Sequence, residues 1–327
     1  MTEEPRADGL VCAYQLDGRG GGEPLTWDEI ARPQPRGMSR WVHLDRAFEN
    51  GRSWLRDQSG LSPLACEALL ADETRPRVDR LPDGLIVVFR GVNLNPGENP
   101  EDMVSLRLWV DEHRLISVRH RRLMAVQDLR EQFSSGDFPR GPGSLLAAIG
   151  AQLAWRMEPV IAGLSERVDD LEGEVITSAA GELRTKLAAL RREIIGLRRY
   201  LAPQRDAMLR LHSETVRWLG DQDRFEIREA ADRTTRYIEE LDAARERVGV
   251  AHEELISRLS EQLNQRMYLL SIIAAIFLPL SLITGLLGIN VGGMPGATSD
   301  AAFMIVSVLL VAIGIGLALV LRRLRFF

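Results

Sequence analysis

The sequence predicts a mixed α+β domain, followed by a long helix and by two carboxyl-terminal helices that can cross a membrane. Three observations predict this fold class. Runs typical of β-strands are confined to the first 120 residues, helical periodicity dominates after Gly143, and two runs of 21 residues near the end contain no charge. The average composition, 45% hydrophobic with a net charge of −5 over 327 residues, conceals this division.

Composition excludes several classes of protein. A chain this rich in apolar residues can bury a core, which excludes a disordered protein. Only Cys12 and Cys66 are present, which excludes a small fold held together by disulfides. Acidic residues outnumber basic ones, 46 to 41, so we expect no nucleic-acid partner.

The two charge-free runs are Met267–Leu287 and Ala301–Leu321, each 21 residues long. About 20 residues, at 1.5 Å per residue, cross the ~30 Å hydrocarbon layer of a bilayer. Helices in the core of a soluble protein are seldom this long without a charge. We therefore expect two membrane spans rather than two buried core helices.

Arginine residues predict the orientation of these spans. Arg258 and Arg266 precede the first span, three arginines follow the second, and the segment 288–300 has no Lys or Arg. The positive-inside rule then places both ends of the chain in the cytoplasm, where the two thiols should stay reduced. Because only Asp300 and those three arginines are charged after Arg266, residues 1–266 carry a net charge of −7. So acidic a domain attracts cations.

The elements are expected in the following order, behind a tail at residues 1–10. Strands are predicted at 10–16, 40–44, 84–94 and 103–120, the last as a hairpin turning at 111–113, and a helix at 53–72. Helices follow at 144–176 and 182–212, in a region punctuated by Gly181 and Pro203. A third helical pattern begins at Asp221 and, if continuous through Leu287, covers 67 residues. Such a helix is ~100 Å long and forms a stalk that enters the membrane.

The chain is divided accordingly. We expect a cytoplasmic α/β domain at 1–143, a helical hairpin region at 144–220, the stalk helix at 221–266, a pore-lining first span at 267–287, an external loop at 288–300, a second span at 301–321, and a basic cytoplasmic tail at 322–327.

A stripe of small and polar residues follows one face of the long helix at alternating steps of three and four. In and before the first span its members are Asn264, Met267, Ser271, Ala274, Leu278, Ser281 and Gly285. Towards the amino end the same stripe carries four carboxylates at seven-residue spacing, Asp232, Glu239, Glu246 and Glu253. About 200° round the helix lies an apolar stripe, Leu241, Ala244, Val248, Ala251 and Leu255.

Two interpretations of the small and polar stripe stay open. Helices that pack in a membrane also select small residues, and the carboxylates would then be a solvated face. Alternatively, several copies of the helix surround a water-filled pore, and the carboxylates form rings that favour cations. A single helical hairpin cannot enclose a pore, so the second interpretation requires an oligomer.

The loop after the first span begins with Gly288, Ile289 and Asn290 and continues through a glycine-rich stretch to Gly296. Asn290 is its only side-chain ligand, and its other polar groups belong to the backbone. One interpretation is a flexible turn. The other is a ring of carbonyls and amides that replaces part of the hydration shell of a cation, with Asn290 in transient contact with the hydrated ion.

At these residues the chain resembles the CorA-type family of divalent-cation transporters. The matching residues are Asn264 and Met267, Pro279 within the first span, the Gly-x-Asn tripeptide 288–290, and Pro295 in the loop, ahead of a second span and a basic tail. The family pattern is Gly-Met-Asn, whereas this chain has Ile289, and Gly296 replaces an acidic residue. With both departures, the loop is similar to that of the ZntB zinc-transporting branch. The stretches ETRPR (73–77), FRGVN (89–93) and EDMVSLRLW (101–109) are similar to the same branch.

The resemblance implies a funnel-shaped homopentamer in a bacterial inner membrane, in which each chain contributes an α/β/α cytoplasmic domain, a stalk helix that forms the pore, and an outer span. It implies transport of Zn²⁺, with Cd²⁺, Ni²⁺ or Co²⁺ as further ions, and no cofactor. Uptake coupled to the proton gradient is the preferred direction. A Mg²⁺/Co²⁺ channel and zinc efflux are the alternatives.

Other chemistry finds little support in the sequence. None of the five histidines is paired at the spacing of a zinc site, and His252-Glu253 lacks the second His of an HExxH motif. Gly18–Gly22 lacks the Lys-Ser/Thr of a phosphate-binding loop. No catalytic residues are assigned, and we expect no enzyme. A membrane-anchored coiled-coil scaffold or sensor is the competing interpretation from another class.

Overall fold

The computed structural model describes residues 8–35, 37–72, 74–134, 138–177, 180–289 and 300–323. The chain forms two compact units, Met1–His252 and Glu253–Phe327, and each is described by itself. One helix, α7 (Asp221–Leu287), contributes to both units.

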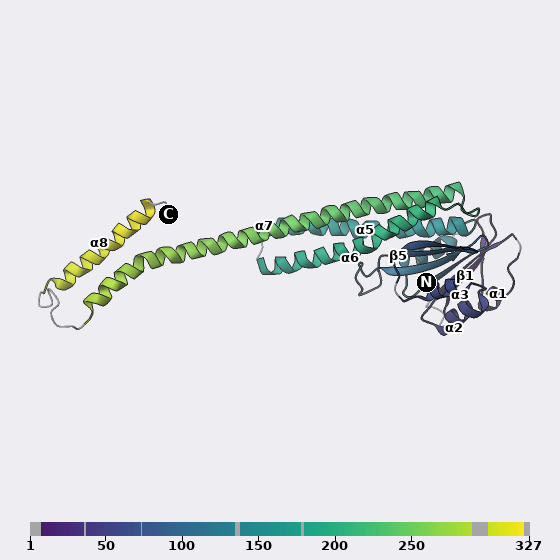
Figure 1. The fold of residues 1–327 in the computed structure, drawn as a ribbon, viewed down its shortest axis with the longest axis horizontal. Helices are drawn as coiled ribbons and strands as arrows, with labels where there is room; N and C mark the ends of the chain where they lie inside the picture. Colours follow the sequence, from purple (N-terminus) through teal and green to yellow (C-terminus); the bar gives the residue numbers. More distant parts are fainter. Residues whose placement is uncertain are drawn as a thin grey trace. The chain divides into compact units, whose positions relative to one another are not determined.

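A seven-stranded sheet is the centre of the first unit (Figure 1). Its strands lie in the order β2-β1-β3-β7-β6-β5-β4. Their bounds are β1 Leu10–Leu16, β2 Gly22–Pro24, β3 Ser39–Asp45, β4 Arg77–Leu81, β5 Gly84–Gly91, β6 Val104–Val110 and β7 Arg114–Arg119. Only the β3–β7 pair is parallel, and it joins the β1–β2 hairpin to the antiparallel β4–β7 meander.

Helices cover both faces of this sheet, which confirms the α/β/α arrangement. Successive residues of a strand point to opposite faces, so Trp41 joins one core and Val42 the other. The core around Trp41 is covered by α4 (Met124–Ser134), α5 (Pro142–Thr177), α6 (Ala180–Ser213) and the first turns of α7. The core around Val42 is covered by α1 (Trp27–Ile30), α2 (Glu49–Ser53), η1 (Trp54–Gln58) and α3 (Pro63–Leu70).

The single helix predicted at 53–72 is wrong. The structure has the end of α2, the π-helical η1 and a separate α3 in this stretch. Gly60 has φ +70°, a left-handed conformation that ends the helical path. Ser62 then caps α3 by accepting from the backbone N–H of Ala65 at 3.3 Å, and Pro63 occupies the first turn.

Other elements differ from expectation. The short elements β2 and α1, strand β4 and helix α4 were not predicted, and β4 has only two apolar residues, Val78 and Leu81, among charged ones. Pro203 lies inside α6 rather than at a break. Leu201 and Gln204, on either side of it, are each 1% exposed, so packing on the sheet maintains the helix through the proline.

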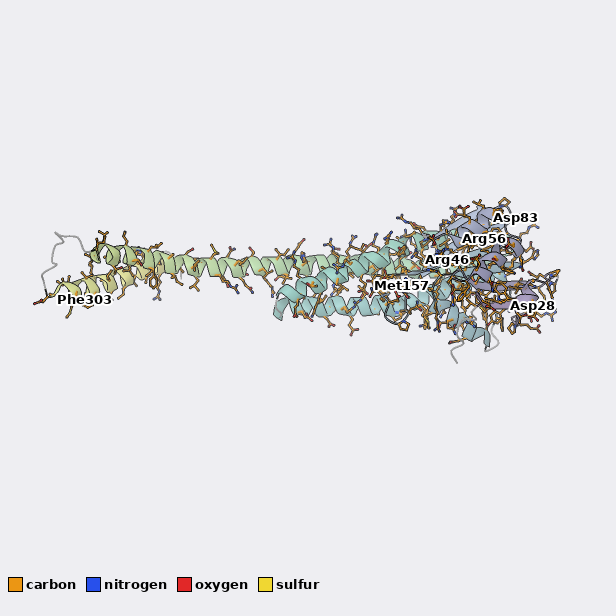
Figure 2. The ribbon with its side chains drawn as sticks, turned by 90° about the horizontal axis from the view of Figure 1, so that it is seen from below. Asp28, Arg46, Arg56, Asp83, Met157 and Phe303 are labelled. Carbon is orange, nitrogen blue, oxygen red and sulfur yellow. The ribbon has the colours of Figure 1, made fainter. Side chains whose placement is uncertain are left out.

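The expected long helix is confirmed over Asp221–Leu287. It begins at Asp221, and the backbone N–H of the preceding Gly220 donates to the Asp223 carboxylate at 3.0 Å. The second apolar helix is α8, Ala302–Arg323, which is also long enough to span a bilayer. Phe303 projects from it with 85% of its surface exposed (Figure 2).

Candidate functional site

In the first unit, one face of α7 is buried against the neighbouring helices. The predicted apolar stripe is confirmed, because its four residues in this unit, Leu241, Ala244, Val248 and Ala251, are at most 6% exposed, and Leu255, in the second unit, is 3% exposed. Thr234 on the same helix is 1% exposed, and its hydroxyl lies 3.8 Å from the sulfur of Met208 on α6. Burial of this stripe leaves the face of α7 that carries Glu239 and Glu246 exposed in the first unit.

Ion pairs flank the buried stripe on both sides. Arg247 of α7 donates to Asp169 and Glu172 of α5. Arg198 of α6 donates to Asp242 of α7, at 2.6 Å from Nε and 3.0 Å from Nη2. The hydrogen bonds that Arg247 donates to Glu172 and Asp169 raise the pKa of Arg247 above its usual value. These contacts attach α7 to both helices of the α5–α6 hairpin.

The carboxylates of the other stripe point away from this interface. Glu239 and Glu246 are exposed, whereas Asp232 is half-buried. Asp232 also accepts a hydrogen bond from Arg228, one turn earlier, at 3.0 Å. Its charge is therefore partly compensated within the helix. Glu253 belongs to the second unit and is exposed there.

In the second unit, α8 packs on one face of α7. Ile272 is 6% exposed, and the side chain of Leu280 approaches Gly314 of α8 closely enough that a Cβ on that glycine would lie 3.8 Å from it. Ile276 and Ile283, on the same face, are half-buried. These four large residues therefore face α8, whereas other large residues of the span, such as Phe277 and Leu282, are exposed.

The small and polar residues lie on the opposite face. Met267 and Leu278 are 62% and 69% exposed, Ala274 is half-buried, and the remaining members are exposed: Asn264, Ser271, Ser281 and Gly285. The hydroxyl of Ser271 donates to the carbonyl of Met267 at 2.8 Å, so it can still present its oxygen outward as an acceptor. Packing of α8 within the same chain does not explain this stripe.

The first two residues of the predicted selectivity loop continue the end of α7. The backbone N–H of Gly288 lies 2.9 Å from the carbonyl of Thr284 and 3.2 Å from that of Gly285. Ile289 is 51% exposed. Asn290 lies outside the described residues, so its contact with an ion stays a prediction.

Histidines and cysteines form no metal centre in the part of the chain that the structure describes. His43 is fully buried in the sheet, with Nδ1 2.7 Å from the hydroxyl of Ser117. His212 is half-buried, and its Nδ1 lies 3.1 Å from the carbonyl of Arg224. Both histidines have structural contacts.

Sequence reasoning missed the ion pairs that hold α7. The charged partners of Arg247 are 75 and 78 residues away along the chain. A signal was present, because Arg247 directly precedes Val248 of the apolar stripe, and charges beside an apolar seam commonly pair with a neighbouring helix. The partner helix could not be identified from that signal.

Comparisons with known proteins agree with this architecture. Residues 37–323 match the family described as "CorA-like Mg2+ transporter protein". The "Divalent cation transporter CmaX" of Pseudomonas aeruginosa is 42% identical over 324 residues, with 97% of each chain covered. The "Zinc transport protein ZntB" of Yersinia pseudotuberculosis is 34% identical over 314 residues, which are 96% of this chain and 94% of the relative. The solved structure of full-length CmaX superimposes with a TM-score of 0.84 at 41% identity, covering 99% of this chain and 100% of the other.

Proposed function

Because the chain belongs to the CorA-like family, whose members are transporters and not enzymes, we propose that it transports Zn²⁺ across a bacterial inner membrane. Transport of divalent cations is the activity of the family's named relatives. Our proposal adds three statements to this activity: that the ion is zinc, in which direction it moves, and that the protein is an oligomer. Cd²⁺, Ni²⁺ and Co²⁺ are further ions that the same path admits.

One observation carries the proposal, the uncovered small and polar stripe of α7. Within one chain, α8 packs on the face that contains Ile272 and Leu280, and the stripe from Ser271 to Gly285 is left without a partner. Small residues leave room for water, and the serine oxygens replace part of the interaction that a hydrated ion has with bulk water. A homopentamer that turns this stripe inward would enclose a pore.

The exposed carboxylates of α7 supply the charge for this path. In an oligomer Glu239 and Glu246 become rings of negative charge, and Glu253 adds another ring from the second unit. Such rings raise the local concentration of dications. Asp232 contributes less, because Arg228 neutralises it within the same helix.

Zinc is favoured over magnesium by the tripeptide at the outer end of α7. Ile289 stands where the family pattern has Met, and a relative of this chain is named a zinc transport protein. In this proposal Asn290 and backbone carbonyls contact the ion through its hydration shell. Uptake is coupled to the proton gradient. Since neither span contains a carboxylate or His, the coupling group must lie in the stalk, at Asp300 or in the loop.

Flux into proteoliposomes tests the proposal. Zinc-65 uptake by the full-length protein should exceed that of empty vesicles and should rise when the outside is made more acidic than the inside. Uptake that ignores the pH gradient would contradict proton coupling alone. Faster release from loaded vesicles than uptake would indicate efflux. No flux above empty vesicles would favour the scaffold or sensor interpretation.

Competition decides between zinc and magnesium. Zinc flux should persist when Mg²⁺ is present at an equal concentration, because the proposed path is selective for zinc. Strong inhibition at that ratio would identify the chain as a Mg²⁺/Co²⁺ channel. The matched control is Asp28→Asn in α1, which removes an exposed charge outside the stalk, the spans and the loop.

A further inference from the structure

The three long helices of the first unit, α5, α6 and α7, continue past the edge of the sheet (Figure 1). Their residues in the core on the sheet end at Ala154 in α5, begin at Ala207 in α6 and end at Ala231 in α7. Buried residues farther along, such as Leu164 and Leu241, lie outside that core. We call the described segments beyond the sheet core the distal bundle: 160–177, 180–202 and 236–252.

Ion pairs give the register between α5 and α6. Arg167 of α5 donates to Glu193 of α6 at 2.5 Å, and Lys186 of α6 donates to Glu174 of α5 at 2.8 Å. The two helices are therefore antiparallel. Each step back along α5 is matched by one step forward along α6.

This register brings an internal proline of each helix to the same level. Eight residues before Arg167 is Pro159, and eight residues after Glu193 is Leu201. Pro159 is thus level with a residue two positions, or about 3 Å, from Pro203. Each proline lacks the N–H that would bond the carbonyl four residues earlier, and its ring crowds that carbonyl. Both helices are therefore weakened at one level.

The same level can be located on α7. The hydroxyl of Thr234 lies 3.8 Å from the sulfur of Met208 on α6, and Asp242 accepts a hydrogen bond from Arg198 of α6 at 2.6 Å. Pro203 is midway between Arg198 and Met208 in sequence. Its level on α7 therefore lies between Thr234 and Asp242.

Two threonine hydroxyls bond to the backbone of α7 where it reaches this level. Thr234 donates to the carbonyl of Ala230 at 2.7 Å, and Thr235 donates to the carbonyl of Ala231 at 3.0 Å. Hydroxyls that bond the carbonyl four residues earlier compete with the backbone N–H groups of the helix and often bend it. All three helices therefore have a weakened hydrogen-bond ladder where they leave the sheet core.

Helix α6 is anchored to the sheet beside its proline. Gln204, which follows Pro203, is 1% exposed, and its Oε1 accepts from the backbone N–H of Arg90 in β5 at 2.6 Å. The guanidinium group of Arg90 lies over the ring of Tyr200, 4.1 Å from its centre. Arg90 therefore contacts α6 on both sides of Pro203, at the position of a pivot.

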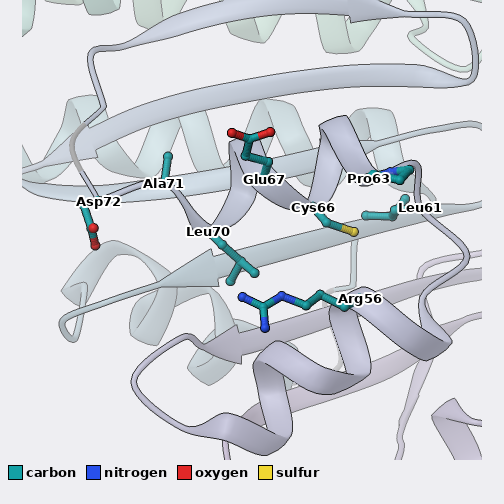
Figure 3. A pocket seen from close by; sticks show the side chains of 8 residues that line it. All are labelled: Arg56, Leu61, Pro63, Cys66, Glu67, Leu70, Ala71 and Asp72. Atoms are coloured by element: carbon teal, nitrogen blue, oxygen red, sulfur yellow. The ribbon is translucent and has the colours of Figure 1, made fainter.

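Open volume separates the distal bundle from part of the sheet domain. A cavity of about 510 Å³ beside η1 and α3 is lined by residues of one short stretch, 56–72, and is unrelated to this boundary (Figure 3). By contrast, a cavity of about 640 Å³ is lined by Glu101 of the β5–β6 loop and by Arg167 and Glu193 of the distal bundle. Its walls therefore belong to both sides of the weakened level. This cavity leaves room for the distal bundle to move relative to the loop.

We propose that the level of Pro159, Pro203 and Thr234 is a hinge, about which the distal bundle swings as one body relative to the sheet during transport. Ion pairs such as that of Arg167 with Glu193 hold the distal helices together while their ladders bend. Because α7 is continuous through this level, bending changes the direction in which it leaves the sheet. The link to transport rests on the proposed function, whereas the hinge itself does not.

Distances between spin labels test the hinge directly. Labels at Glu67→Cys on α3 and Arg184→Cys on α6 lie on opposite sides of the level, and labels at Glu166→Cys and Arg184→Cys lie within the distal bundle; all three residues are exposed. The full-length protein, with Cys12→Ala and Cys66→Ser, is labelled and diluted with unlabelled chains, so that distances within one chain dominate. We expect more than one distance for the first pair and a single distance for the second. A single narrow distance for both pairs would overturn the hinge.

Substitutions locate the hinge. Pro159→Ala combined with Pro203→Ala restores both backbone donors, and alanine favours a helix far more than proline does, so the first label pair should move towards a single distance. The control is Pro142→Ala at the first residue of α5, where a missing N–H costs nothing, and it should retain the wild-type distances. Thr234→Val is a second variant that removes the hydroxyl and should also narrow the distribution. Distances that change in neither hinge variant would refute this level as the hinge.

Flux and stability measured together separate a hinge from a structural role. The double proline variant should retain or raise the Tm and lower zinc flux several-fold, whereas Pro142→Ala should change neither. A fall in Tm together with flux would assign the prolines a structural role and contradict the proposal. Unchanged flux in a variant with narrowed distances would refute the role in transport. If the wild type carried no zinc, the proposed function would fail, and the label distances would still decide the hinge.

Discussion

Arg247 of α7 holds Glu172 of α5 with two donors of one guanidinium group, although 75 residues separate the pair in sequence. Nε lies 3.0 Å from one carboxylate oxygen, and Nη2 donates to the other. This side-on geometry fixes the rotation of α7 as well as its position. Glu246 precedes Arg247 and is turned about 100° from it, so the same contact leaves Glu246 exposed.

Removing this contact should affect transport more than stability. Because the three side chains are 37–64% exposed, Arg247→Met is expected to reduce the free energy of unfolding by at most about 1 kcal/mol. Zinc flux should be affected more strongly than stability, since α7 loses a constraint on its rotation. The double variant Arg247→Glu/Glu172→Arg should recover flux. Arg228→Met, which breaks an exposed pair within α7, is the control, and equal loss of flux in it would contradict a positioning role for Arg247.

The buried stripe of α7 should be far more sensitive to truncation than the exposed one. Leu241 is fully buried, so Leu241→Ala should lower the free energy of unfolding by about 2–5 kcal/mol. Glu239→Ala, two positions earlier on the exposed face, should change it by less than about 0.5 kcal/mol. Denaturant unfolding of the detergent-solubilised protein measures both. Similar losses would mean that α7 is not oriented as described.

Acidification should destabilise the seven-stranded sheet through His43. Burial, and then repulsion from Arg119 and Arg130, holds the pKa of His43 well below its usual value in the folded protein. The unfolded chain, with a His pKa of about 6.5, therefore binds the proton more readily. The contribution of neutral His43 to the free energy of unfolding is complete above about pH 6.5. It is lost as the pH falls below this value, by up to about 1.4 kcal/mol per pH unit. The decrease in the free energy of unfolding between pH 7.5 and pH 5 should be smaller in His43→Gln than in the wild type. His113 is exposed, so His113→Gln should show the same decrease as the wild type.

Neutralising the exposed carboxylates should weaken cation flux without preventing assembly. Glu246→Gln combined with Glu253→Gln removes two proposed rings of charge, so flux at low zinc concentration should fall several-fold and recover at high concentration. Size-exclusion chromatography should show an unchanged oligomer. Asp232→Asn is the matched control, because Arg228 already compensates that charge. Unchanged flux in the double variant would make these residues a solvated face only.

Asn290 should matter for transport and little for folding. Asn290→Ala removes the only side-chain ligand of the proposed selectivity loop, and we expect a loss of zinc flux of at least about tenfold. The Tm of the variant should stay close to that of the wild type, because a short hairpin loop contributes little to a core. Asn290→Asp tests the ligand chemistry by retaining an oxygen donor, and it should keep part of the flux. A variant that transports normally would exclude Asn290 from the ion path.

Local sequence patterns were sufficient to predict the elements whose buried residues recur at a regular spacing. The strong alternation of β6 and its turn to β7 predicted a hairpin that the structure confirms. The apolar stripe of α7 was predicted from its spacing and is buried throughout. By contrast, β4 is stabilised by pairing with β5 and by contact with α6, which its own charged sequence does not reveal.

The sequence by itself determined the two helices that are long and apolar enough to span a membrane, the extent of α7 and the stripes along it, because helix period and hydrophobic length are local properties of a chain. Only the tertiary structure decided which face of α7 is covered, since that depends on the α5–α6 hairpin and on Arg247 finding Asp169 and Glu172. The tertiary structure alone also brought Arg46 and Arg107 to one carbonyl oxygen. Contacts between distant segments follow from sheet order and packing, and no periodicity within one segment encodes them.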